Sequence, residues 1–146
     1  MFRTEGSTVI VRPVEDVFDF VADERNEPKY NPRMVQAEKV TPGPIATGTR
    51  WSATVESGRR PLDMEIETTD YTRPIRLGSE TIMSMAEIRG VVTFEPDPAG
   101  TRLGWFWEVQ PKGVLRLLSP ITRRIGRRQE AENWDRLKRY LESPRQ

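Results

Sequence analysis

The spacing of hydrophobic residues changes twice along the chain. The first segment, STVIVRP at residues 7–13, is a short β-branched run and predicts a strand ending at Pro13. From Val14 the apolar residues recur every three or four positions, which predicts an amphipathic helix. Its stripe consists of Val14, Val17, Phe18, Val21 and Ala22. The prolines of NEPKYNP end this region, so we expect one or two short helices after the first strand.

Six strand-like segments follow, separated by the turn sequences TPGPIATG, ESGRRP, YTRP and PDPAG. With the first strand they make seven, and the short connections predict an antiparallel meander. The segments are Met34–Val40, Thr49–Glu56, Leu62–Tyr71, Ile75–Met83, Ile88–Glu95 and Thr101–Val109.

After Gly113 the period is helical almost to the end of the chain, and Pro120 fits a helix start with Ser119 as its cap. Strands and helices are therefore segregated, which indicates an α+β fold. A length of 146 residues fits one domain, residues 1–146, with room for a single core or a modest pocket.

Composition excludes several chemistries. The chain has no Cys and no His, so disulfides, thiolate nucleophiles and a Ser-His-Asp triad are absent, and we expect no metal and no cofactor. The net charge of +1 gives no general attraction to nucleic acid. Because the chain shows no membrane span and its first residues lack a signal-peptide pattern, we expect a cytoplasmic protein.

The aromatic run TRLGWFWEV raises the question of what lies inside the sheet. Alternate residues of a strand share a face, so Leu103, Trp105, Trp107 and Val109 point inward. The same phase places further apolar residues and a few hydroxyls inward on the other strands. These residues include Trp51, Met64, Ile66, Thr68, Ser79, Thr81 and Met83. They either fill a core or line a cavity for an apolar ligand.

The last helix has an apolar stripe that becomes small and polar toward its N-terminus. Trp134, Leu137 and Leu141 form the stripe, and steps of four and seven residues lead back to Glu130, Gly126 and Thr122, with Asn133 beside them. Glycine costs about 1 kcal/mol in a helix relative to alanine. It either leaves space for a ligand or marks a kink.

Glu130 is the candidate catalytic residue of this stripe. Burial beside tryptophans would raise its pKa and make it a proton donor or a hydrogen-bonding group. The alternative is a solvated helix residue paired with Arg127 or with the turn of Trp134.

A second apolar group on this helix comprises Leu118, Ile121 and Ile125, on the side opposite Trp134. Five arginines flank it: Arg116, Arg123, Arg124, Arg127 and Arg128. From Val114 to the last residue the sequence contains nine Arg and Lys but only four Asp and Glu, so this segment is basic. Such a strip either contacts an anionic membrane or a partner peripherally, or joins the core if the helix bends near Gly126. A homodimer is also left open.

The order of elements resembles the helix-grip fold of the START/Bet v 1-like (SRPBCC) superfamily, and within it the polyketide cyclase/dehydrase and lipid-transport type. Two stretches carry the resemblance, VIVRPVEDVFDFVADERNEPKYNP, with Tyr30 where a Trp is common, and LLSPITRRIGRRQEAENWDRLKRYLE. The resemblance implies a seven-stranded curved antiparallel sheet wrapped around the C-terminal helix, with a cavity between them.

The resemblance also favours a function in the binding or carriage of a hydrophobic small molecule, such as a lipid, an isoprenoid or a polyketide. Two alternatives are an acid/base enzyme of the cyclase/dehydratase type that uses Glu130, and a protein-interaction module. The expected ligand-binding residues are Trp51, Met64, Ile66, Thr68, Ser79, Thr81, Met83, Trp105, Trp107, Thr122, Gly126, Glu130 and Asn133.

Overall fold

The computed structural model describes residues 1–58, 60–113 and 120–144, without the side chains of Ser57 and Thr122. The predicted Ser119 cap and Leu118 lie outside these residues. In chain order the elements are β1 (Phe2–Ile10), α1 (Val14–Ala22), the 3₁₀ helix η1 (Glu24–Lys29), β2 (Met34–Lys39), β3 (Arg50–Ser57), β4 (Arg60–Thr72), β5 (Arg76–Met83), β6 (Ala86–Asp97), β7 (Gly100–Pro111) and α2 (Pro120–Glu142).

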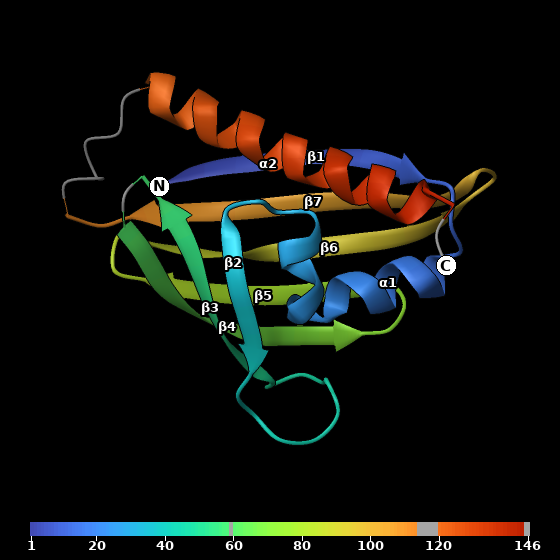
Figure 1. Cartoon of the computed structure of the whole chain (residues 1–146). Coiled ribbons are helices and arrows are strands. Elements are labelled where there is room, and N and C mark those ends of the chain that lie inside the picture. The colour runs from blue at the N-terminus through green and yellow to red at the C-terminus, as the bar shows by residue number, and fades with distance from the viewer. Residues whose placement is uncertain (59, 114–119, 145–146) are drawn as a thin grey trace.

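In the described part of the chain, seven strands form one antiparallel sheet in the order β1-β7-β6-β5-β4-β3-β2. The strands from β2 to β7 follow one another as a meander, and β1 pairs with β7. The strand direction changes from β1 and β7 to β2 and β3, so the sheet curves, and α2 lies across it near β1 (Figure 1). This architecture confirms the predicted helix-grip α+β fold.

The main core forms where α1 and α2 meet the sheet. Val17 and Phe18 of α1 are fully buried, and Val21 and Ala22 nearly so, as the helical stripe predicts. From α2, Leu137 is fully buried among the same residues. The stripe of the last helix therefore faces the sheet, which fixes the rotation of α2 about its axis and decides where its polar positions point.

The first strand begins five residues earlier than the sequence predicts. Phe2 pairs with Val109 and Gly6 with Trp105, so the FRTEG segment forms a strand although it lacks a β-branched run. Pairing with β7 outweighs weak intrinsic propensity. As a result Phe2 and Thr4 reach the interior beside α2.

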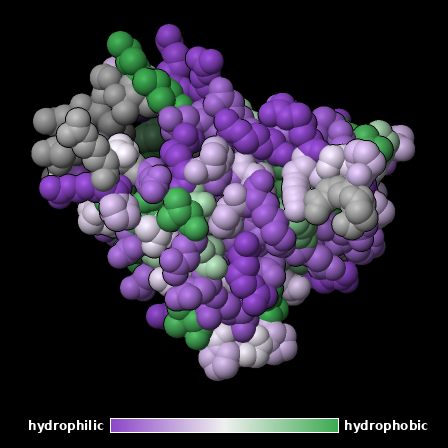
Figure 2. Space-filling view, viewed as in Figure 1, coloured by the Kyte–Doolittle hydropathy of each residue, from purple (hydrophilic) through white to green (hydrophobic). Residues whose placement is uncertain are grey.

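The outer face of α2 keeps two large apolar side chains in solvent. Ile121 is 68% exposed and Ile125 is 50% exposed, and α2 continues through Gly126 as one helix. The expectation that a bend brings these residues into the core is therefore wrong. Figure 2 shows hydrophobic surface at the start of α2 beside strongly hydrophilic surface. No described helix has the length and apolarity needed to cross a bilayer.

Candidate functional site

A cavity of about 430 Å³ lies between the concave face of the sheet, η1 and α2. Its wall on the sheet side is mainly apolar, because the inward positions of five neighbouring strands, β3 to β7, alternate with solvent-facing ones. These wall residues include Val55, Leu62, Met64, Ile66, Leu77, Met83, Ile88, Val92 and Val109. Its other side, formed by η1 and α2, carries most of the polar groups. The cavity is therefore amphipathic.

Most of the residues selected from the sequence lie on this wall. They come from β4, β5, β7 and α2, and the structure brings them together around one space. They are Met64, Ile66, Ser79, Thr81, Met83, Trp107, Gly126, Glu130 and Asn133. A Cβ at Gly126 would meet no atom within 4 Å, so this glycine borders open space.

The structure places three of the selected residues in the core, away from the cavity wall. Trp51 is 1% exposed, and its Nε1 donates a hydrogen bond of 3.2 Å to the Oγ1 of Thr68. Trp105 stacks on Trp134 with ring centroids 5.4 Å apart. Gly6 permits this packing, because a Cβ there would collide with the Trp105 ring. A strand's phase therefore predicts the inward face but not which inward residues border open space.

Glu130 stands at the centre of the polar side. Its Oε2 accepts hydrogen bonds of 2.7 Å from the Nε1 atoms of both Trp107 and Trp134. Arg127, the alternative partner considered from the sequence, instead donates to the backbone carbonyl of Arg3 at 3.2 Å. Glu130 is therefore held by two indoles and is not a solvated helix residue.

The pKa of Glu130 lies above its ordinary value, in the direction expected from the sequence. Burial is the largest cause, and the charge of Glu27 adds to it. The two indole hydrogen bonds and the positive charge of Arg33 lower the pKa and offset part of this effect.

Sequence reasoning missed a second group of polar residues, which lies on η1. Glu24, Glu27 and Tyr30 are spaced by three, and in a 3₁₀ helix residues i and i+3 lie on one face. All three line the cavity. The period of three in DERNEPKYNP is the available signal, but the two prolines of this segment obscure it because they indicate the end of a helix.

The carboxyl groups of this segment interact closely. Burial raises the pKa of Glu24 well above its ordinary value, and the charge of Glu27, a hydrogen bond to Glu27 and the charge of Asp23 reinforce the effect. Glu27 accepts a hydrogen bond of 2.8 Å at its Oε2 from the Nδ2 of Asn31. Burial and the neighbouring carboxyl of Glu27 therefore raise the pKa of Glu24 in the same direction.

Tyr30 connects the two groups of acids. Its ring stacks on Trp134 with centroids 6.3 Å apart. Burial raises the pKa of its phenol well above the ordinary value, and the charges of Glu27, Glu24 and Glu130 contribute. All three carboxyls therefore lie close enough to influence one hydroxyl. We call these four residues, Glu24, Glu27, Tyr30 and Glu130, the acidic end of the cavity.

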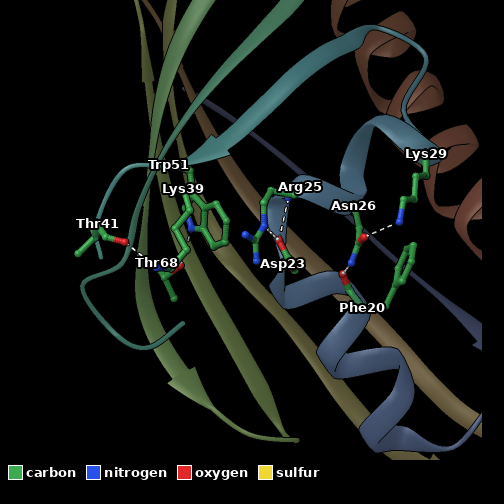
Figure 3. A network of polar contacts seen from close by, with 9 residues as sticks. All are labelled: Phe20, Asp23, Arg25, Asn26, Lys29, Lys39, Thr41, Trp51 and Thr68. Atoms are coloured by element: carbon green, nitrogen blue, oxygen red, sulfur yellow. Dashed lines mark hydrogen bonds and ion pairs between the residues drawn. The ribbon is translucent and has the colours of Figure 1, made fainter. Parts of the chain in front are cut away.

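Polar contacts outside the cavity hold η1 in place (Figure 3). The Nδ2 of Asn26 donates to the carbonyl of Phe20 at 3.0 Å, and the Nζ of Lys29 donates to the Oδ1 of Asn26 at 2.9 Å. Asp23 accepts hydrogen bonds from the backbone and the guanidinium of Arg25. These contacts fix the orientation of η1, so its inward carboxyls are positioned without a ligand.

Comparison with known proteins places this geometry in a class. The chain has the fold of solved structures that share little sequence with it. One is the Zhui aromatase/cyclase from a Streptomyces species, with a TM-score of 0.78 and 13% identity, covering 97% of this chain and 93% of that one. Another is TTHA0849 from Thermus thermophilus, with a TM-score of 0.77 and 16% identity, covering 96% of this chain and 97% of that one.

A third solved structure of this fold is Ara h 8.0201, with a TM-score of 0.74 and 13% identity, covering 96% of this chain and 97% of that one. The class is therefore the helix-grip, Bet v 1-like fold. The chain belongs to the family described as polyketide cyclase / dehydrase and lipid transport, which matches residues 1–142. A search of curated proteins gives no match.

Proposed function

We propose that this protein binds a hydrophobic small molecule non-covalently in the cavity between the sheet and α2. The observation that carries the proposal is the cavity itself, whose volume of about 430 Å³ lies in the range of small-molecule sites. Burial of the ligand against the sheet would supply about 25 cal/mol per Å² of apolar surface. The polar groups at the acidic end would orient it.

Native mass spectrometry of the protein purified from its own host tests this proposal. A bound small molecule that is released on denaturation supports it. A panel of hydrophobic dyes, isoprenoids and aromatic polyketides gives a second measurement. Absence of any co-purified molecule, together with no binding across the panel, would contradict it.

A second candidate function is proton-transfer catalysis of the cyclase/dehydratase type. The observation that favours it is the convergence of Glu24, Glu27 and Glu130 on one part of the cavity, since neighbouring carboxyls in a partly buried site can serve as acid and base. A protonated Glu24 would donate a proton to a substrate oxygen, and Glu27 would accept one from carbon.

Solvent deuterium exchange into a bound aromatic β-diketone, followed by NMR, separates an enzyme from a carrier. Catalysed exchange that falls at least about tenfold in both Glu24→Gln and Glu27→Gln supports the enzyme. Exchange at the uncatalysed rate while the ketone is bound contradicts it. The third alternative is a protein-interaction module. A filled core would have favoured it, whereas the cavity favours ligand binding.

We also propose that the start of α2 contacts an anionic membrane surface while the ligand is exchanged. The side chains of Ile121 and Ile125 are exposed, and the guanidinium groups of Arg123 and Arg127 lie 5.7 and 5.8 Å from the centroid of the Phe2 ring. Phe2 also lines the cavity. The apolar and basic surface therefore borders the cavity, and its charge suits anionic lipid headgroups.

A further inference from the structure

The charges around the cavity are strongly unbalanced. Among the described residues that line it, the acidic ones are Glu24, Glu27, Glu56 and Glu130, and the basic one is Arg33. Three of the four carboxyls belong to the acidic end. A ligand that fills the cavity therefore places its polar group in a region of negative charge.

The nearest cations of η1 do not neutralise these carboxyls. Arg25 pairs with Asp23 at 2.8 Å, and Lys29 bonds Asn26 while its Nζ lies 5.6 Å from the ring centroid of Phe20. Within the described ranges, no Lys or Arg forms a salt bridge with a carboxyl of the acidic end. Because buried charges in proteins are normally paired and burial raises the pKa values of Glu24 and Glu130, this end can exchange a proton for a bound cation.

The hydroxyl of Tyr30 is an independent sign of a ligand. Tyr30 is only 7% exposed and lines the cavity, yet among the described residues nothing hydrogen-bonds its hydroxyl. The hydroxyl is accessible from the cavity, so a ligand in the cavity can donate a hydrogen bond to it. The rings of Tyr30 and Trp107, which both line the cavity, also suit a cation, since aromatic faces attract positive charge.

From these observations we propose that the ligand is an amphipathic amine, whose protonated amino group binds at the acidic end and whose apolar body extends along β4, β5 and β6. This inference rests on the proposed ligand-binding function and specifies the chemical class of the ligand. An ammonium group has three donors, enough to reach the Tyr30 hydroxyl and two carboxylates together.

Other polar groups fit this end less well. A carboxylate or phosphate would face three acids with only Arg33 to attract it, and like charges in a partly desolvated site repel. A neutral alcohol donates a single hydrogen bond and leaves the carboxyls unpaired. The order of affinity should therefore be amine, alcohol and then carboxylate on the same apolar body.

Isothermal titration calorimetry with matched ligands tests this order. The ligands are naphthylmethylamine, naphthylmethanol and naphthoate, with decylamine, decanol and decanoate as a second scaffold. On at least one scaffold we expect the amine to bind at least about tenfold more tightly than the alcohol, as a charge-assisted hydrogen bond implies, and the carboxylate most weakly. Amine binding should also release protons to the buffer.

Variants assign the preference to the acidic end. Glu27→Gln keeps an acceptor for Asn31 but removes the charge, so the preference for amine over alcohol should fall severalfold. Glu65→Gln removes an exposed charge from β4 and should leave the preference intact. If the alcohol or the carboxylate binds as tightly as the amine, or if Glu65→Gln lowers the preference as much as Glu27→Gln, the inference is overturned and the proposed binding function stands. If neither scaffold nor the hydrophobic panel binds, both are overturned.

Discussion

The Nε1 of Trp107 donates a hydrogen bond of 2.7 Å to the Oε2 of Glu130, which joins β7 to α2 across the edge of the cavity. The indole of Trp134 bonds the same oxygen from within α2. The Glu130 carboxyl therefore binds the indoles of Trp107 on the strand and Trp134 on the helix, and these bonds set the separation of sheet and helix at this point. The contact combines a structural role with control of the carboxyl's protonation.

Replacing Trp107 with Phe should loosen this connection. Phe keeps an aromatic wall but donates no hydrogen bond, so the free energy of unfolding should fall by about 1.5–3 kcal/mol, the usual range for a hydrogen bond to a charged group. The pKa of Glu130 should rise further, because the Trp107 bond lowers it. Carboxyl NMR titration and urea unfolding measure the two effects. Phe106→Leu on the same strand is the control, and an unchanged pKa in Trp107→Phe would show that the bond is absent in solution.

The raised pKa values of Glu130 and Glu24 predict how stability depends on pH. A carboxyl whose pKa is higher in the folded state binds more protons there, so the free energy of unfolding falls as pH rises from the ordinary carboxyl pKa through the folded-state value. The groups facing Glu130 are Glu27, Arg33 and the two indoles. Glu130→Gln should therefore flatten this decline and preserve or raise stability at neutral pH.

Glu142 on the same helix serves as a control, because its pKa is shifted in the opposite direction to that of Glu130. Hydrogen bonds from Lys138 and from the backbone N–H of Val11 lower the pKa of Glu142 against the effect of burial. Its contribution to stability is present above the ordinary carboxyl pKa and is lost as pH falls through the folded-state value. Glu142→Gln should weaken the protein at neutral pH and leave the decline at higher pH unchanged. Equal pH profiles for the wild type and Glu130→Gln would contradict the assignment to Glu130.

Sequence periodicity predicted the sheet, its inward faces and the buried stripes of α1 and α2, because each depends on a local period that burial enforces. It did not separate wall from core: Trp105 and Trp107 share a face, but Trp105 stacks on Trp134 whereas Trp107 lines the cavity. That difference depends on how α2 lies on the sheet. Sequence periodicity also missed Glu24 and Glu27, because the short 3₁₀ helix that carries them contains Pro28 and has no apolar stripe.

Tryptophan fluorescence should report ligand binding from two of the four tryptophans. Trp107 and Trp134 line the cavity, whereas Trp51 and Trp105 are buried away from it. A ligand that changes the polarity at the acidic end should shift or quench the emission, and Trp107→Phe should remove a large part of that signal. Trp51→Phe should retain it. A ligand-induced signal that disappears in Trp51→Phe but persists in Trp107→Phe would place the ligand elsewhere.

Gly126 offers a direct test of the cavity's volume. A Cβ there meets nothing within 4 Å, so Gly126→Ala should stabilise α2 by up to about 1 kcal/mol through helix propensity. Gly126→Leu should project into the cavity and weaken ligand binding at least about tenfold without loss of fold. Ala131→Leu, at an exposed position of α2, is the matched control. Circular dichroism and calorimetry measure fold and affinity, and unchanged affinity in Gly126→Leu would show that the ligand does not use this space.

The start of α2 should bind vesicles that contain anionic lipid. Ile121 and Ile125 supply apolar side chains, and each Arg near the surface adds about 1 kcal/mol of attraction. Cosedimentation should therefore be strong with phosphatidylserine vesicles, weak with neutral vesicles and reduced by salt. Ile125→Glu should lower the partition coefficient at least about tenfold, because it removes an apolar contact and adds a repelled charge. Ile82→Glu, at a position on β5 that is 47% exposed, makes the same change away from the arginines. Equal losses in the two variants, or equal binding to neutral and anionic vesicles, would exclude this surface as the membrane contact.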